Sequence, residues 1–193
     1  MKVVPDTRAI DLLASDLVRS PGLHASTVFG SLFEELDPKR YKYNAPPNPV
    51  SLAMGTAWEQ HLEYLLVKNG IDAVRPGEFV SPEGIAYSPD LILSNGVIRC
   101  GEIKWTSKFG RGLPDKPANN LPPSYDKYLC QLKLYIYWLR LEFGCEVQGW
   151  LALALMYQPW NPQFRAFNID FVDRELQDNA DMCLNYARSE GMI

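Results

Sequence analysis

The sequence contains no Cys-x-x-Cys pair, and its four cysteines stand far apart at positions 100, 130, 145 and 183. Zinc sites are usually built from cysteine and histidine ligands at short paired spacings, so the sequence predicts no zinc site. We also predict no disulfide. Because free cysteine behaves as a small apolar residue, Cys130 is expected to pack in the core.

Long apolar runs are also missing. The longest, residues 150–157, is far too short to span a bilayer. The first residues, MKVVPDTRAIDLL, lack the uninterrupted apolar stretch of a secretory signal. We therefore expect no membrane association and a cytoplasmic location. A chain of 193 residues with 47% hydrophobic content is long enough, and apolar enough, for one globular domain.

Basic charge is scarce overall, with a formal net charge of −4, but it is unevenly spread. Residues 99–133 contain seven Lys or Arg and three acids, and Lys108, Arg111 and Lys116 fall in one expected loop. Such a loop can clamp phosphates, or it can be an ordinary solvated loop. The two interpretations stay open.

A second basic stretch alternates cations with aromatic rings at Lys39, Arg40 and Tyr41. Bases of a single nucleic-acid strand can stack on such rings while cations follow the phosphates. Loops of this composition are also common without any ligand, so both interpretations are kept.

Hydrophobic periodicity and turn residues predict an α/β protein, with a central mixed β-sheet flanked by helices. The expected order of elements includes an αβββαβ core. We expect helices at about 7–36, 51–69 (with Ser51 as N-cap), 124–143 and 172–190, strands near 71–80, 84–93, 97–106, 147–158 (buried) and 164–170 (edge), and a long connection at 108–123.

A hairpin carries the most informative residues. Asn95-Gly96 is a strong signal for a type I′ turn, and it lies between apolar runs at 91–93 and 97–100. The resulting antiparallel pair brings Asp90 and Glu102 to the same end. Glu102 and Lys104 are two residues apart on one strand, so they project from one face about 6 to 7 Å apart.

These residue types suit metal chemistry. Mg²⁺ and Mn²⁺ prefer carboxylates, backbone carbonyls and water, so Asp90, Glu102 and the carbonyl oxygen of Ile103 are candidate ligands. Lys104 can orient or deprotonate a water molecule and stabilise charge on a phosphate. An isolated Glu-x-Lys is usually just a surface ion pair. The ordered combination favours a nuclease.

The flanking helices add three candidates. Glu59 lies beside the apolar stripe of the 51–69 helix, where an acid is costly unless it is paired or bound to a metal. Gln131 and Tyr135 are four residues apart and share one face of the 124–143 helix. That glutamine can contact nucleic acid or the lysine, or it can merely cap a backbone group.

The order Gly55-x-x-x-Glu59, Ser88-Pro89-Asp90, Glu102-x-Lys104 and Gln131-x-x-x-Tyr135 resembles the PD-(D/E)xK nuclease superfamily, most closely its RecB-like and lambda-exonuclease-like branch. The likeness spans residues 51–157, with a weaker echo in the helix at 24–36. It implies a restriction-endonuclease-like αβββαβ core. It also implies metal ligation by Glu59, Asp90 and Glu102, with Lys104 as the catalytic lysine. Gln131 and Tyr135 would form the accessory pair.

Some RecB-like enzymes use a histidine from the first core helix as an extra ligand, which makes His61 a candidate. Residues 59 and 61 point in different directions on a helix, so we prefer Glu59. Other members hold an iron–sulfur cluster on one early and three late cysteines. That pattern is missing, so no cluster is expected.

The resemblance implies a Mg²⁺- or Mn²⁺-dependent deoxyribonuclease, with an exonuclease in recombination, repair or DNA-end processing as the first expectation. The alternatives are a restriction-type or structure-selective endonuclease, and a non-catalytic module that binds DNA or protein. DNA is the expected partner, and a homo-oligomer or a recombination partner protein is compatible. The expected division is 1–50 (helical part and loop), 51–170 (catalytic core) and 171–193 (helix), within one nuclease domain.

Overall fold

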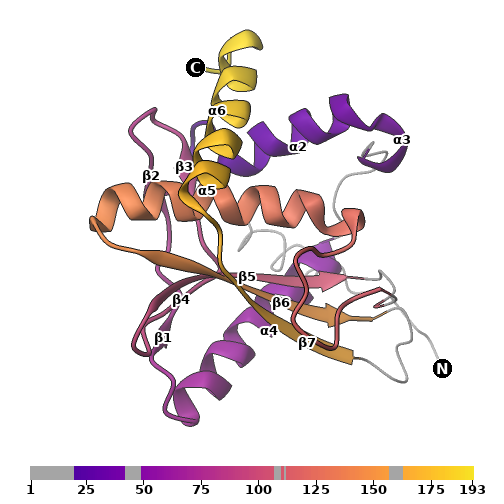
Figure 1. The fold of residues 1–193 in the computed structure, drawn as a ribbon, viewed down its shortest axis with the longest axis vertical. Coiled ribbons are helices and arrows are strands. Elements are labelled where there is room, and N and C mark those ends of the chain that lie inside the picture. The colour runs from indigo at the N-terminus through magenta and orange to yellow at the C-terminus, as the bar shows by residue number, and fades with distance from the viewer. Residues whose placement is uncertain (1–19, 42–48, 107–109, 111, 157–162) are drawn as a thin grey trace, which may run out of the picture.

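The computed structural model describes residues 20–41, 49–106, 110, 112–156 and 163–193. A five-stranded sheet runs in the order β1-β4-β5-β6-β7, and helices lie on both of its faces (Figure 1). The predicted α/β architecture with a mixed sheet between helices is confirmed. The elements are α2 (Ala25–Leu36), α3 (Pro38–Tyr41), α4 (Pro49–Lys68), β1 (Ala73–Val74), β2 (Phe79–Val80), β3 (Ala86–Tyr87), β4 (Leu91–Leu93), β5 (Ile98–Thr106), the 3₁₀ turn η1 (Pro123–Tyr125), α5 (Asp126–Phe143), β6 (Val147–Leu155), β7 (Gln163–Ile169) and α6 (Asp173–Ser189).

Two of the predicted strands are each divided in two. The expected strand at 71–80 is interrupted after β1 at Pro76-Gly77, where Gly77 has a positive φ of 79°. The expected strand at 84–93 is interrupted at Ser88-Pro89, between β3 and β4. Proline cannot donate to a sheet ladder, which explains both breaks. β2 and β3 therefore pair with each other as a separate hairpin outside the main sheet.

The predicted type I′ turn at Asn95-Gly96 is wrong. Of its two central residues only Gly96 has a positive φ, whereas a type I′ turn needs two. Leu93 pairs with Arg99, so the turn is longer, and the backbone N–H of Ser94 donates to the carbonyl oxygen of Asp72 before β1. This contact keeps Ser94 in line with the neighbouring strand.

The longer turn decides which face the acidic residues occupy. In the observed register Leu91 is opposite Gly101, so continuing this register places Asp90 opposite Glu102. Residues directly opposite each other in an antiparallel pair share a face. A two-residue turn would have shifted the register by one and moved Asp90 to the other face. The observed register therefore keeps Asp90 on the same face as Glu102, as the expected cluster requires.

The β5-α5-β6 unit forms the centre of the molecule. β5 and β6 are parallel over nine residue pairs, and β6 is almost wholly buried, as its apolar run predicted. β7 is the edge strand beside it. Helix α5 covers one face of the sheet, and α2 and α6 pack on its outer side (Figure 1). The buried thiols of Cys130 and Cys183 meet there, with their sulfurs 3.6 Å apart.

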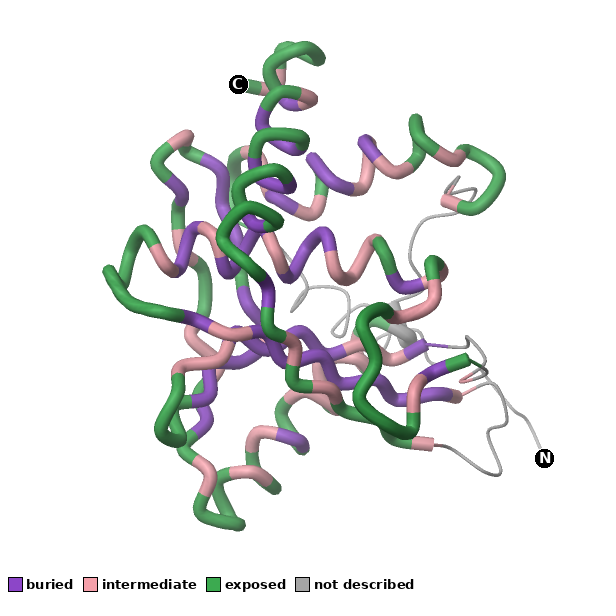
Figure 2. The backbone as a smooth tube through the Cα atoms, viewed as in Figure 1, coloured by how far each residue is buried: buried purple, intermediate pink, exposed green. Residues whose placement is uncertain are grey.

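Helix α4 covers the opposite face more loosely. Among its described side chains only Leu62 is buried, and Figure 2 shows burial concentrated in the sheet and α5 instead. The helix begins at Pro49, so the prediction of Ser51 as N-cap is wrong. Proline suits the first helical turn because its φ is already helical. None of the described helices is long and apolar enough to cross a membrane.

At the N-terminal end, the expected helix at 7–36 is observed from Ala25, and residues 1–19 lie outside the described part of the chain. The start of α2 is tied to the small hairpin, since the backbone N–H of Ala86 donates to the carbonyl oxygen of Leu23 (2.8 Å). This contact brings the first turn of α2 close to the strand that leads to Asp90.

Candidate active site

The site lies where β5 extends beyond its pairing with β4. β4 pairs with β5 only at residues 99–101, while β6 pairs with it along its whole length. Gly101 stands at the end of the paired part, where an added Cβ would lie 2.9 Å from the Cβ of Leu91. Only glycine allows this close approach without a shift. Beyond Gly101, one edge of β5 is therefore open to other groups.

Asp90 satisfies part of that open edge. Its Oδ2 accepts a hydrogen bond of 2.7 Å from the backbone N–H of Ile103. The N–H and C=O of one strand residue point to the same side, so the carbonyl oxygen of Ile103 faces the open edge as well. The Asp90 carboxylate and the Ile103 carbonyl oxygen are therefore neighbours at this edge.

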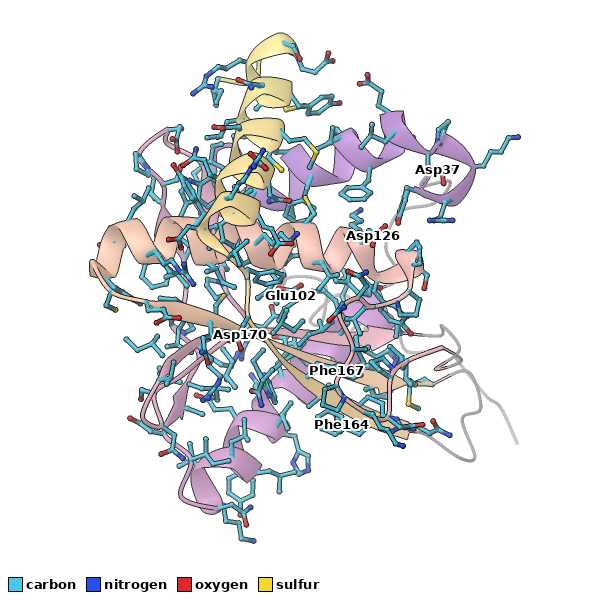
Figure 3. All side chains as sticks on the ribbon, viewed as in Figure 1. Asp37, Glu102, Asp126, Phe164, Phe167 and Asp170 are labelled. Atoms are coloured by element: carbon cyan, nitrogen blue, oxygen red, sulfur yellow. The ribbon has the colours of Figure 1, made fainter. Side chains whose placement is uncertain are left out.

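Glu102 and Lys104 point to the α5 side of the sheet. Glu102 is fully buried, and its label in Figure 3 lies between α5 and the strands. The Lys104 ammonium forms an ion pair with Glu102, and it lies 3.6 Å from Oδ2 of Asp90. The Lys104 side chain keeps 24% of its surface exposed. The ammonium therefore lies between two carboxylates at the boundary between core and solvent.

Helix α5 holds Glu102 from the other side. The Gln131 side-chain amide donates to Oε2 of Glu102 (2.8 Å) and contacts the hydroxyl of Tyr135 (3.3 Å). Gln131 and Tyr135 are both buried. Because they come from successive turns of a well-packed helix, the position of the Glu102 carboxylate is fixed before any ligand binds.

The pKa values of Glu102 and Lys104 are shifted from their usual values. Burial, together with the nearby charge of Asp90, raises the pKa of Glu102 to about 8. Burial lowers the pKa of Lys104, but the Asp90 and Glu102 carboxylates outweigh it, and the net pKa is raised. Lys104 is therefore a cation at neutral pH. A buried carboxyl whose pKa is raised by a second acid gains from an additional positive charge.

Glu59 reaches the site from α4. Its side chain is 20% exposed, and Oε2 accepts a hydrogen bond of 3.2 Å from the Arg75 guanidinium. Burial and the charge of Asp90 raise the pKa of Glu59 to about 7, against the opposing effects of Arg75 and Lys104. Glu59 therefore lies within electrostatic range of the cluster, but its direct partner is an arginine.

These residues line a cavity of about 620 Å³. Asp90, Ile103 and Lys104 contribute from the strands, Glu59 from α4, and Gln131 and Tyr135 from α5. A second cavity of about 480 Å³ adjoins it and contains Arg75. The two cavities share Glu59, Glu78, Ser88 and Asp90. Two of the three candidate acids, Glu59 and Asp90, thus lie where the two cavities meet, whereas the buried Glu102 lines neither cavity.

The carboxylate and carbonyl oxygens of these residues are the ligands that a hard divalent cation prefers. The three acids, however, do not converge on one point. Among the described residues, no group of three or more His, Cys, Asp or Glu side chains is arranged as a metal site. Lys104 lies against Asp90 and Glu102, and Arg75 holds Glu59. Cationic side chains thus take the positions beside all three acids. Glu59 and Glu102 have raised pKa values, and Asp90 lies beside the carbonyl oxygen of Ile103. Together they offer the oxygen ligands that Mg²⁺ or Mn²⁺ prefers.

Other candidates from the sequence lie apart from the cavities. His61 is exposed, and its ring stacks on Tyr64 with centroids 6.3 Å apart. Arg40 pairs with Asp37, and the Tyr41 ring packs edge-on against Phe33. Neither His61 nor the Lys39-Arg40-Tyr41 stretch lines either cavity.

The predicted basic loop is only partly described. Lys116 is exposed in the connection between β5 and α5. Lys108 and Arg111 lie outside the described residues. A role for this loop in DNA binding stays a prediction.

Several polar or charged cavity residues were missed from the sequence. Among them are Arg75 and Glu78, around the break between β1 and β2, and His24 and Ser26 at the start of α2. Arg75 and Glu78 flank a Pro-Gly turn, which is a signal for a break but not for chemistry. Only the tertiary contact between Arg75 and Glu59 shows that the position matters.

Comparisons with known proteins give distant likenesses only. No protein-family model matches the chain, and no curated protein matches it. Among solved structures, an alkaline exonuclease (LHK-Exo) from Laribacter hongkongensis matches with 18% identity and a TM-score of 0.49, over 88% of this chain and 89% of that one. The same exonuclease in complex with dAMP gives 17% identity and a TM-score of 0.45 over the same shares.

A third structure, of the protein SSO0001, matches with 16% identity and a TM-score of 0.45, over 93% of this chain and 83% of that one. These identities are all below 20% and the TM-scores are below 0.5. The likenesses therefore assign neither a family nor an activity to the chain.

Proposed function

We propose that the chain is a divalent-metal-dependent deoxyribonuclease that hydrolyses phosphodiester bonds in DNA. One observation carries the proposal: the Lys104 ammonium lies between Asp90 and the buried Glu102, and Asp90 and Lys104 line a cavity together with Glu59. Carboxylates and a carbonyl oxygen can hold a divalent cation, and a lysine can stabilise the charge that develops on a phosphate during hydrolysis.

In this proposal, Asp90, Glu102 and the Ile103 carbonyl oxygen hold Mg²⁺ or Mn²⁺, with Glu59 as a further ligand. The bound ion would polarise the phosphate and lower the pKa of a water molecule. Gln131 fixes the Glu102 carboxylate by donating to it, and the Tyr135 hydroxyl supports Gln131 by contacting the same amide nitrogen. Lys104 has a raised pKa and so serves as a cation that orients water and stabilises phosphate charge, rather than as a base.

An exonuclease in recombination, repair or DNA-end processing is the form of this activity that we favour, from the motif order in the sequence. A restriction-type or structure-selective endonuclease is the alternative. Linear duplex and covalently closed circular DNA of the same sequence separate them, in buffer with Mg²⁺ and then Mn²⁺. An exonuclease degrades the linear form and leaves the circle intact, because the circle offers no end. Cutting of the circle at a similar rate would favour the endonuclease.

A non-catalytic DNA-binding module is the second class of function. The Lys104→Ala variant distinguishes it, since loss of a positioning cation removes cutting without removing the DNA-binding surface. We expect cleavage to fall by about 100-fold or more while DNA affinity changes little. Lys68→Ala is the matched control, because Lys68 lies exposed at the end of α4 and lines neither cavity. Unchanged cleavage in Lys104→Ala would refute the role given to this lysine.

A further inference from the structure

Arg75 contacts two acids of α4 and lines the second cavity, but the chemistry proposed above gives it no role. It follows β1 directly, and its guanidinium donates to Oε2 of Glu59. Its backbone N–H donates to Oε1 of Glu63, one turn further along α4 (3.0 Å). The backbone of Arg75 is thus anchored to α4 by a contact that does not involve Glu59. The guanidinium can change partner while its backbone stays in place.

The second cavity gives that guanidinium somewhere to go. Its lining contains Arg75, Gly77, Ser88 and Pro89 together with three acids, and Arg75 is the one cation among these residues. Two of the acids, Glu59 and Asp90, are the candidate metal ligands. The third, Glu78, is already engaged at the start of α2, where it pairs with His24 (3.5 Å) and accepts from Ser20. With a cation on the first two acids, the guanidinium is left as the free charge of the cavity.

We propose that Arg75 alternates between two partners: it pairs with Glu59 in the metal-free protein, and it binds a phosphate of the DNA strand in the second cavity once Glu59 turns to the metal. This inference rests on the proposed nuclease function, and it names a binding subsite for the substrate beside the reacting phosphate. In the metal-free state Arg75 competes with the metal for Glu59. In the loaded state it contributes to DNA affinity.

The contrast among the acids supports this assignment. The Glu102 carboxylate is held by the buried Gln131 side chain, and Asp90 is held by the backbone of Ile103. Asp90 and Glu102 also share Lys104, whereas Glu59 accepts its hydrogen bond from the Arg75 guanidinium, a side chain that is one-third exposed. A guanidinium binds carboxylate and phosphate oxygens with the same fork of N–H donors, so the exchange needs no new chemistry.

The test measures metal and DNA binding separately in Arg75→Gln. Mn²⁺ alone is titrated into the DNA-free protein by calorimetry at pH 8.5. We expect about fivefold tighter Mn²⁺ binding than in wild type, because the competing ion pair is gone. A 20-nucleotide DNA strand is then bound in the cleavage-deficient Lys104→Ala background. In Mn²⁺, Arg75→Gln should weaken this binding about fivefold. In EDTA it should change it less than about twofold.

Arg165→Gln is the matched control. Arg165 is also paired with an acid, Asp115 at 2.7 Å, but it lines neither cavity. It should alter neither Mn²⁺ nor DNA binding. Arg75→Lys, which keeps the charge and the anchored backbone, should shift both affinities in the same directions by smaller factors. This variant keeps the test decisive even when the glutamine variant folds poorly.

Opposite effects on metal and DNA are the required result, since a merely structural arginine would weaken both. Weaker Mn²⁺ binding in Arg75→Gln would overturn the proposal, because it would make Arg75 a support for the metal site. Equal DNA affinity in Mn²⁺ would overturn it as well, even in a protein that cuts DNA. Failure of the wild-type protein to bind Mn²⁺ and to cut would instead overturn the nuclease function together with this inference.

Discussion

Helices α5 and α4 form opposite walls of the site, and they are held in very different ways. Helix α5 has eight buried residues, among them Gln131 and Tyr135, which fix Glu102. Helix α4 has only Leu62 buried among its described side chains, and its Glu59 is held by a partly exposed arginine. One wall is therefore assembled before any ligand arrives. The other supplies an acid that can change partner.

The two walls therefore differ in how readily their residues can move. Residues on a packed element keep their geometry, whereas those on a loosely packed element open and adjust at lower cost. In the proposed function, Asp90, Glu102 and Lys104 would define the chemistry, while Glu59 and Arg75 would respond to metal and DNA. The following experiments can break or sharpen that distinction.

The largest expected effect is on cleavage, in Glu102→Gln compared with Glu59→Gln. Glu102 is the proposed metal ligand that the fixed wall holds, so its loss should reduce cleavage by about 1,000-fold. Glu59 belongs to the adjustable wall, and its loss should cost about 10-fold to 100-fold. Single-turnover rates at saturating Mg²⁺ measure both. Equal losses would show that α4 is as essential to the centre as α5.

Stability should divide in the same way. Leu132 of α5 is fully buried, so Leu132→Ala should lower the free energy of unfolding by about 2 to 5 kcal/mol. Leu65 of α4 is 36% exposed, and Leu65→Ala should change it by no more than about 0.5 kcal/mol. Denaturant titrations provide both values. A large cost for Leu65→Ala would mean that α4 is packed more tightly than its exposure indicates.

Gln131→Leu probes the fixed wall without removing an acid. The variant keeps the side-chain volume but leaves Oε2 of Glu102 without its 2.8 Å donor. We expect cleavage to fall about 10-fold to 100-fold, mainly through the rate constant rather than DNA affinity. Gln177→Leu on the exposed side of α6 is the matched control. A loss confined to DNA affinity would assign Gln131 to substrate contact instead.

The smallest effect concerns pH. The pKa of Glu102 is raised to about 8 and that of Glu59 to about 7, from a usual value of 4.5. The folded protein therefore keeps protons that the unfolded chain releases, and the contribution of these groups to stability falls as pH rises from about 4.5 to about 8. Metal binding requires the deprotonated acids, so the rise in Tm on adding Mn²⁺ should be larger at pH 8.5 than at pH 6.

In Glu102→Gln, the decline of metal-free stability over this pH range should become shallower, because one titrating acid has been removed. The same denaturant titrations at pH 5, 6.5 and 8 measure it. A decline as steep as in the wild-type protein would show that Glu102 is not buried beside another charge.

Much of the site was predictable because it lies on elements with strong local signals. The strand around Glu102 and Lys104 has clear periodicity, and so does the helix with Gln131 and Tyr135. The packing of α5 on the sheet then brings the strand and the helix together. The turn at Asn95-Gly96 was predicted wrongly, since the contact between Ser94 and Asp72 overrides the local preference. That contact joins β4 to the segment before β1, and no window around the turn contains both.

Arg75 illustrates what sequence patterns leave out. Its partner Glu59 is sixteen residues away, on the helix that precedes the strand, and nothing in the local pattern marks the pair. Short strands such as β1 and β3 were likewise drawn too long, because proline breaks are easier to place once the neighbouring strand is known.

Diffraction from crystals soaked in Mn²⁺ with a short DNA strand tests the central claim most directly, because anomalous scattering locates the ion. We expect an anomalous peak that touches the carboxylates of Asp90 and Glu102 and the carbonyl oxygen of Ile103, with Glu59 turned from Arg75 toward it. A structure at saturating Mn²⁺ with no peak at the open edge of β5, and with Lys104 and Arg75 still paired to the acids, would contradict the account.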